Sequence, residues 1–135
     1  MVFTGAKLVE AKLILAGSDQ AIKIFSFDFG FTQYTDETGK PTGYPTGGTI
    51  NFMIESTPDT VLIDWMLDAK ALKNGKIEIG NKDKVIEFKN AACIQYHESF
   101  NHMGGAQPMT TSFTISAEEI KVGGAPPFQQ KRKTV

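Results

Sequence analysis

Two histidines and a glutamate lie close together in the stretch HESFNH, where they could in principle bind a metal ion. The side chains concerned are His97, Glu98 and His102. The surrounding residues predict a strand, on which His97 and Glu98 would point to opposite faces, while His102 follows in a glycine-containing loop. A shared metal would need a bend that the sequence does not predict, so we expect no metal site and no cofactor.

Other reactive residue types do not form a catalytic set. Glu55, Asp59 and Asp64 could supply acid and base groups, but Asp59 and Asp64 are better explained by a helix that begins near them. Cys93 is the single cysteine and lies in the apolar run NAACIQY, which predicts a buried, inert thiol. No Ser-His-Asp or Cys-His pattern with supporting context is present. We therefore expect a protein that is not an enzyme.

The glycine-rich stretch TDETGKPTGYPTGGTI, residues 35–50, could suggest phosphate binding. However, Gly39-Lys40 is followed by Pro41 rather than by Ser or Thr, and the next segment predicts a strand rather than a helix. The amide donors of a helix N-terminus are therefore missing. The tandem KPTG and YPTG instead combines prolines, which restrict the backbone, with glycines, which allow reversals. We expect a shaped arm that serves as a binding loop or as a contact between subunits.

The elements that must position this arm are predicted to be strands. Apolar and polar residues alternate over residues 9–15, 21–34 and 50–55. The second of these segments contains four phenylalanines at a spacing of two, which we expect to form a stripe in the core: Phe25, Phe27, Phe29 and Phe31.

The apolar period changes to that of a helix in TPDTVLIDWMLDAKALKNG, where we predict a helix over residues 58–73. Thr57 would cap it, Pro58 would occupy its first turn, and Asn74-Gly75 would end it.

Beyond the predicted helix, KIEIG and KVIEFKN predict a hairpin, and AACIQYHESF and PMTTSFTISA predict two further strands. The fold class is therefore mainly β, with about seven strands and one α-helix, and short connections favour antiparallel pairing. Such a sheet must close into a barrel, pack on itself or give its edges to a neighbour.

The composition predicts one domain without a strong electrostatic preference. The chain has 135 residues, with 14 Lys and Arg against 15 Asp and Glu, and a formal charge of -1. Its basic residues are scattered, so we expect no binding to nucleic acid. No run approaches the roughly 20 apolar residues that a membrane span needs, so we expect no membrane insertion. The N-terminal residues lack the form of a secretory signal, which predicts assembly in the cytoplasm. We expect a domain at residues 1–123 and a mobile tail at residues 124–135, rich in Pro and Gly and then basic.

The succession of motifs from Phe25 to Leu67 resembles the type VI secretion tube protein family (Hcp, also called TssD), in its divergent branch. The similar features are the aromatic strand ending in Gln33, the run Gly-x-Pro-x-Gly-x-Pro-x-Gly-Gly, and the step Asp64-Trp65-Met66. IQYHESF and PMTTSFTISAEEIKVG also resemble the family. The resemblance covers most of residues 7–123 and none of the tail.

This resemblance implies a small antiparallel β-barrel of two sheets with one helix on its side, assembled into a homohexameric ring. Such rings stack into a hollow tube inside a contractile sheath, and contraction drives the tube into a target cell. The implied partners are other copies of the chain, the sheath, spike and baseplate proteins, and effector proteins held in the lumen. Export by this machine without a signal peptide is implied as well, and catalysis and cofactors are not.

In a tube, the arm would contact a neighbouring subunit, with Tyr44 as its anchoring side chain. The residues expected at this ring or stacking interface are Gly39, Lys40, Pro41, Gly43, Tyr44, Pro45, Gly47 and Gly48.

Two alternatives remain open. A tube subunit of a phage tail or of a related contractile injection system would share the architecture. A monomeric small-molecule carrier with an apolar cavity would also suit the length and strand count, although it would seldom need the arm or the helix between strands.

Overall fold

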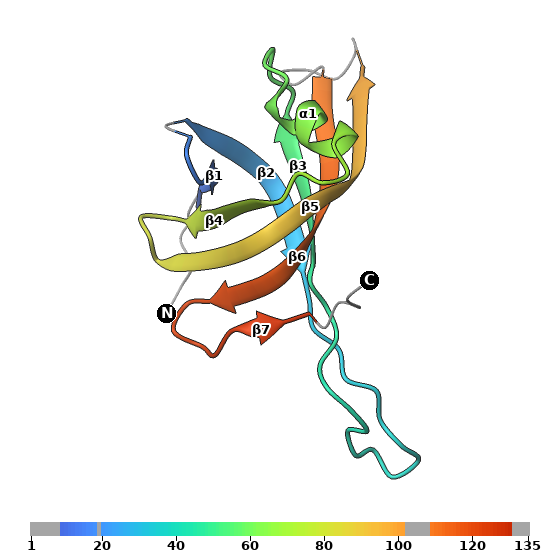
Figure 1. The fold of residues 1–135 in the computed structure, drawn as a ribbon. Helices are drawn as coiled ribbons and strands as arrows, with labels where there is room; N and C mark the ends of the chain where they lie inside the picture. Colours follow the sequence, from blue (N-terminus) through green and yellow to red (C-terminus); the bar gives the residue numbers. More distant parts are fainter. Residues whose placement is uncertain (1–8, 19, 102–108, 131–135) are drawn as a thin grey trace.

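Alternating apolar and polar residues form seven strands in the computed structural model, which describes residues 9–18, 20–101 and 109–130. One short helix lies between the third and the fourth strand (Figure 1). The elements in chain order are β1 (Ala11–Leu15), β2 (Ala21–Phe29), β3 (Thr49–Glu55), α1 (Val61–Leu67), β4 (Lys73–Ile79), β5 (Lys84–Phe100), β6 (Met109–Val122) and β7 (Phe128–Gln129).

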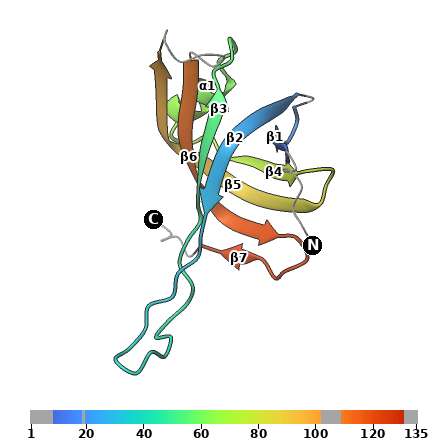
Figure 2. The same ribbon diagram turned by 180° about the vertical axis from the view of Figure 1, so that it is seen from behind.

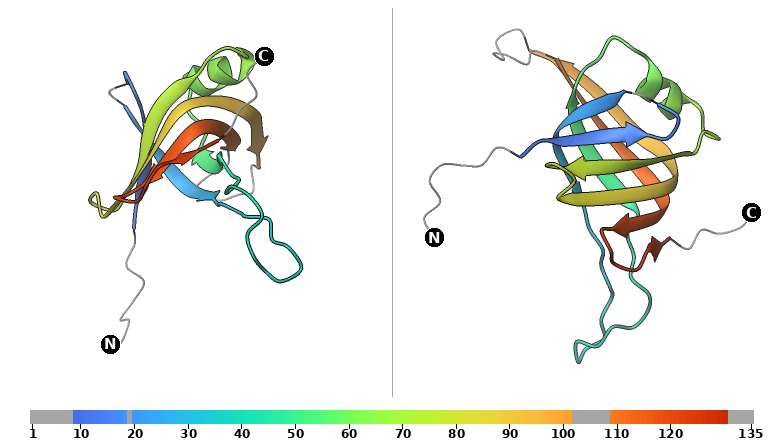
Figure 3. Two further views of the ribbon diagram at one scale, coloured as in Figure 1. Left: turned by 60° about the horizontal axis from the view of Figure 1, so that its bottom comes forward. Right: turned by 90° about the vertical axis from the view of Figure 1, so that its left-hand side faces the viewer.

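The strands pair in the order β3-β2-β1-β4-β5-β6-β7, and a further pairing between β3 and β6 closes the sheet. Every pairing is antiparallel. Figure 3 shows the strands curving around a common interior. The predicted antiparallel barrel with one helix is confirmed. Its hydrogen bonding runs continuously around the barrel, so the two sheets implied by the resemblance are here one closed sheet.

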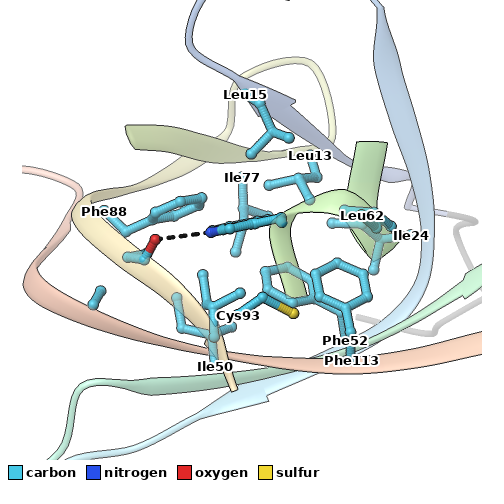
Figure 4. Close-up of a cluster of buried hydrophobic side chains, with 14 of the residues drawn as sticks. Leu13, Leu15, Ile24, Ile50, Phe52, Leu62, Ile77, Phe88, Cys93 and Phe113 are labelled. Atoms are coloured by element: carbon cyan, nitrogen blue, oxygen red, sulfur yellow. Dashed lines mark hydrogen bonds between the residues drawn. The ribbon is translucent and has the colours of Figure 1, made fainter. Parts of the chain in front are cut away.

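The core fills the inside of this barrel. On β3, Ile50, Phe52 and Ile54 are buried, while the residues between them are exposed, because successive side chains of a strand point to opposite faces. Phe52 stacks on Phe113 of β6 with ring centroids 4.8 Å apart. Figure 4 shows that Leu62 of α1 also lies among the buried side chains, so the helix covers one side of the core.

The helix is shorter than predicted at its start. It spans Val61–Leu67 rather than residues 58–73, and Thr60 rather than Thr57 precedes its first turn. The Asp59 carboxylate accepts a hydrogen bond from the backbone N–H of Val61, 3.2 Å away. Asp59 therefore lies at the helix start as expected, but outside the helix itself.

The helix also ends earlier than predicted, because its tryptophan ties the following chain to the barrel. Asp68 already has an extended backbone. The indole N–H of Trp65 donates to the carbonyl oxygens of Ala71 and of Ala91 on β5, each at 3.1 Å. Because Trp65 holds Ala71 next to β5, the chain after the helix runs along the barrel and enters β4. Asn74 and Gly75 therefore lie in β4 and do not end a helix.

Two strands predicted separately are one long strand, β5. The predicted hairpin of β4 and β5 is present, but β5 continues to Phe100 and stays paired with β6. The register shifts between Cys93 and Gln95, which indicates a bulge at Ile94. The predicted break lies instead at Asn90, which has a φ of 53°, and there the pairing with β4 shifts register between Lys73 and Gly75.

The C-terminal segment folds back onto the barrel, so the expectation of a mobile tail is wrong up to Gln130. Phe128 pairs with Ile120 of β6, and the backbone N–H of Gln130 donates to the carbonyl oxygen of Glu118 at 2.7 Å. Since β3 pairs with β6 only as far as Ser116, the rest of that β6 edge is open to another strand. The basic run at residues 131–133 lies outside the described residues.

Candidate functional site

A long hairpin arm, residues 30–48, leaves the barrel between β2 and β3. It projects from the end of the barrel opposite to α1 (Figures 1 and 2). The two sides of the arm are joined by backbone hydrogen bonds. Thr32 and Thr46 exchange two such bonds, with N···O distances of 2.9 and 2.6 Å, and the N–H of Thr42 donates to the carbonyl of Tyr34 at 2.8 Å. The arm is therefore a ribbon with its own internal structure rather than an open loop.

The tip of the arm is organised by Asp36. One oxygen of its carboxylate accepts hydrogen bonds from the Thr38 hydroxyl at 2.7 Å and from the backbone N–H groups of Thr38 and Lys40 at 2.8 and 3.1 Å. The Thr38 hydroxyl bond, followed by these two N–H bonds, lowers the pKa of Asp36 below its usual value. Gly39, with a φ of 86°, completes the turn. Asp36 was not among the expected site residues, although aspartate before such a turn is a known sequence signal.

The root of the arm is tightly packed around two glycines. A Cβ atom on Gly47 would lie 2.7 Å from the carbonyl oxygen of Gly30. Gly48 has a φ of 105°, and a Cβ there would lie 2.5 Å from Oε1 of Gln130 and 3.0 Å from the carbonyl oxygen of Ala117. Glycine at these two positions lets the arm enter β3 directly beside the C-terminal segment.

A row of aromatic rings leads from the core to the arm root. Ring centroids are 6.3 Å apart for Phe27 and Phe29, 5.8 Å for Phe29 and Phe31, and 4.8 Å for Phe31 and Phe128. Phe27 and Phe29 pack against the core as expected, but Phe25 does not, because Ile24 is the buried residue there and the pairing with β3 shifts between Ile24 and Ser26. Phe31 does not, because β2 ends before it and 42% of its surface is exposed.

Two grooves lie at the arm root, where the arm meets the C-terminal segment. One has a volume of 630 Å³ and is lined by residues 44–47 and 127–130. The other has a volume of 480 Å³ and is lined by residues 31–33, Pro45 and residues 125–128. We call these two the arm-root grooves. Their described lining residues include aromatic, proline, threonine and glutamine side chains and no charged ones.

The expected interface residues are distributed along the whole arm. Gly39, Lys40 and Pro41 lie at its tip, and Tyr44, with 72% of its surface exposed, lies between tip and root. The remaining members are Gly43, Pro45, Gly47 and Gly48. Sequence reasoning missed Phe31, Phe128 and Gln130 as parts of this region. Only the short run Phe-Gln-Gln after Pro-Pro could have indicated Phe128 and Gln130, since their partners lie far away in the chain.

Within residues 9–18, 20–101 and 109–130, the side chains that could do chemistry are not gathered into one site. The Tyr96 hydroxyl donates a hydrogen bond to Glu98, which places Glu98 on the Tyr96 face of β5 and His97 on the opposite face. Burial, with the nearby Glu98 carboxylate, raises the pKa of Tyr96 to about 12. His102 lies outside the described residues. Among the residues that are described, no group of three or more His, Cys, Asp or Glu side chains could hold a metal ion.

Cys93 and Asp64 have structural roles that their contacts explain. Burial raises the pKa of the Cys93 thiol, which keeps it protonated and unreactive. Asp64 accepts a hydrogen bond from the hydroxyl of Thr60 one turn earlier, at 2.9 Å. In the part of the chain that the structure describes, no helix has the length and apolar character needed to cross a membrane.

Comparisons with known proteins agree on one family. A family model described as "Hemolysin coregulated protein Hcp (TssD)" matches residues 8–129. The structure of Hcp1 from Flavobacterium johnsoniae is 31% identical, with a TM-score of 0.79, and the alignment covers 90% of this chain and 99% of that one. No curated protein sequence matches significantly.

More distant structures share the fold alone. Hcp1 from Salmonella typhimurium is 12% identical, with a TM-score of 0.67 over 88% of this chain and 91% of that one. A chain in the sheath-tube complex of an extracellular contractile injection system is 14% identical, with a TM-score of 0.57 over 92% of this chain and 95% of that one.

Proposed function

The chain belongs to the Hcp (TssD) family, and on that basis we propose that it is the structural subunit of the inner tube of a type VI secretion system. The observation that carries this proposal is the family match over residues 8–129, with its 31% identical structural relative. The family consists of structural tube proteins rather than enzymes. In this proposal, hexameric rings of the chain stack into a hollow tube that a contractile sheath propels.

The shape of the subunit supports a role in assembly. The barrel interior is filled by large side chains such as Trp65 and Phe88, each 1% exposed, which argues against a carrier with an apolar cavity. In contrast, the arm places exposed side chains, Tyr34 and Tyr44, away from the barrel, with 70% and 72% of their surfaces exposed. Large aromatic side chains of this kind are frequent anchors of protein interfaces.

We propose further that the arm contacts a neighbouring subunit, in the same ring or in the next. Its tip is held by Asp36 and its root by Gly47 and Gly48, so it presents Tyr44 in a defined direction. Sheath, spike and baseplate proteins are the other proposed partners, with effector proteins as cargo in the lumen. The assembled machine would export the subunit.

Negative-stain electron microscopy of the purified protein tests the main proposal. We expect rings with six-fold symmetry, alone or stacked, and a solution mass six times that of the subunit. Uniform monomers at high protein concentration would contradict the proposal.

Deletion of residues 40–47 tests the arm. We expect a folded subunit that fails to close rings or to stack them, because these residues make no contribution to the barrel pairings. The control is Lys23→Ala on the outer face of β2, which should assemble normally. If the deletion variant formed normal tubes, the proposal that the arm contacts a neighbouring subunit would be wrong.

A tube subunit of another contractile injection system is the second candidate. The fold shared with a chain of such a sheath-tube complex favours it. Capture of sheath and spike proteins from the native host by the tagged chain separates the two, because each system supplies its own set of partners.

A further inference from the structure

The arm-root grooves have the properties of a docking surface. They are formed by two segments that are distant in the sequence, and they adjoin each other along Pro45, Pro127 and Phe128. Their volumes of 630 and 480 Å³ lie within the range of roughly 300–1,000 Å³ that is typical of pockets for small ligands. A large apolar side chain therefore fits in either one.

An apolar pair is exposed at the other end of the barrel. Phe100, the last residue of β5, is paired with Met109, the first residue of β6. Their exposed fractions are 65% and 40%. Both lie at the barrel end that carries α1, whereas the arm leaves the opposite end (Figures 1 and 2). We call this pair the β5 tip.

We propose that the β5 tip of one subunit inserts into the arm-root grooves of a second copy of this chain. This inference rests on the proposed function, because it names the contact between subunits that the tube requires. The match in chemistry favours this occupant, since the tip is apolar and the described groove lining carries aromatic and proline side chains without charge.

The placement of the two surfaces determines the kind of assembly. When copies align in the same direction, as in the proposed tube, the contact is heterologous, because each copy uses its β5 tip on one neighbour and its arm-root grooves on another. In that arrangement each pair leaves one tip and one set of grooves open, so the contact continues into a ring or a stack, whereas a reciprocal pair of antiparallel copies would stop at a dimer. This is the geometry that subunits of a tube need.

Disulfide cross-linking tests the proposed contact. The double variant Phe100→Cys with Pro127→Cys carries one thiol in the tip and one in the grooves. Upon oxidation of assembled protein, we expect a ladder of covalent multimers extending beyond the dimer. A mixture of the two single variants should instead stop at dimers. The buried Cys93 stays in all variants.

The matched control is Phe100→Cys with Lys23→Cys, which has the same tip thiol and a second one on the exposed outer face of β2. It should give no ladder. If Phe100→Cys with Pro127→Cys does not fold, Met109→Cys with Gln129→Cys tests the same contact. Far-ultraviolet circular dichroism before oxidation shows whether each double variant, the control included, is folded.

Electron microscopy of the same samples distinguishes a failure of the proposed contact from a failure of the proposed tube function. Rings or tubes without a ladder would overturn the proposed contact and leave the proposed function intact. Monomers without rings would overturn both. A ladder from the control pair equal to that from the tip and groove pair would also overturn the contact, because it would indicate random collision.

Discussion

Replacement of Gly48 by alanine tests how strongly the arm root is fixed. Gly48 has a φ of 105°, a backbone conformation that alanine rarely adopts, and its carbonyl oxygen accepts a hydrogen bond of 2.7 Å from the N–H of Ala117. The added methyl group would meet Oε1 of Gln130 at 2.5 Å and the carbonyl oxygen of Ala117 at 3.0 Å. The side chain of Gln130 can rotate away, but the Ala117 carbonyl belongs to the backbone of β6 and cannot move freely.

The expected loss of stability follows from these contacts. The strained backbone costs about 1–3 kcal/mol, and the forced shift beside Ala117 costs about 1–3 kcal/mol more. The smaller conformational freedom of the unfolded alanine variant offsets about 0.4–1 kcal/mol of this. We therefore expect Gly48→Ala to lower the free energy of unfolding by about 1–5 kcal/mol, a large part of the usual total of about 5–15 kcal/mol.

Gly43→Ala is the matched control in the same arm. Gly43 is not among the glycines with positive φ, and no described atom lies within 4 Å of the position of its added Cβ. We expect this variant to be unchanged or stabilised by up to about 1 kcal/mol.

Urea unfolding of both variants, followed by tryptophan fluorescence, measures the difference. At a slope of about 2 kcal/mol per molar urea, the midpoint of Gly48→Ala should fall by about 0.5–2.5 M. A Gly48→Ala midpoint equal to that of the wild type, or one matched by an equal loss in Gly43→Ala, would refute the argument.

Two further predictions concern the anchors of the helix and of the arm tip. Trp65→Phe should lower the free energy of unfolding by about 2–4 kcal/mol, because it removes two hydrogen bonds of the indole N–H and leaves a gap in the core. Leu67→Ala on the exposed face of α1 should change it by less than about 0.5 kcal/mol in the same urea experiment. The pKa of Asp36 is lowered by its hydrogen bonds, so their contribution is present above the unfolded pKa of about 3.9 and is lost as the pH falls through the folded pKa. NMR signals of the Thr38 and Lys40 amides should follow this titration, and in Asp36→Ala they should not.

The strands could be predicted because their pattern is local. On β3 every second side chain enters the core, and the same alternation is visible in the letters TINFMIE. A barrel of this size places one face of each strand inside, so two-residue periodicity is enough to identify most of the sheet. The arm was also predictable, because its glycines and prolines mark a long shaped connection.

The ends of the elements and the lining of the site depend on contacts between distant residues. The helix ends early because Trp65 binds the backbone of β5, which local periodicity does not encode. Similarly, β7 forms only because part of the β6 edge is left open by β3. The arm-root residues Phe128 and Gln130 were missed for this reason, since their neighbours Phe31 and Gly48 lie some eighty residues or more earlier in the chain.

The C-terminal segment connects the folding of the barrel to the direction of the arm. Because the closed sheet uses its own backbone hydrogen bonds, we expect the proposed assembly to depend largely on segments outside it, such as the arm. These segments could change without unfolding the subunit. Phe128 and Gln130 differ, because they pair with β6 on one side and contact Phe31 and Gly48 of the arm root on the other. A change in this segment would therefore alter the arm-root grooves while the barrel core stayed intact, which makes it the place where assembly can be varied separately from folding.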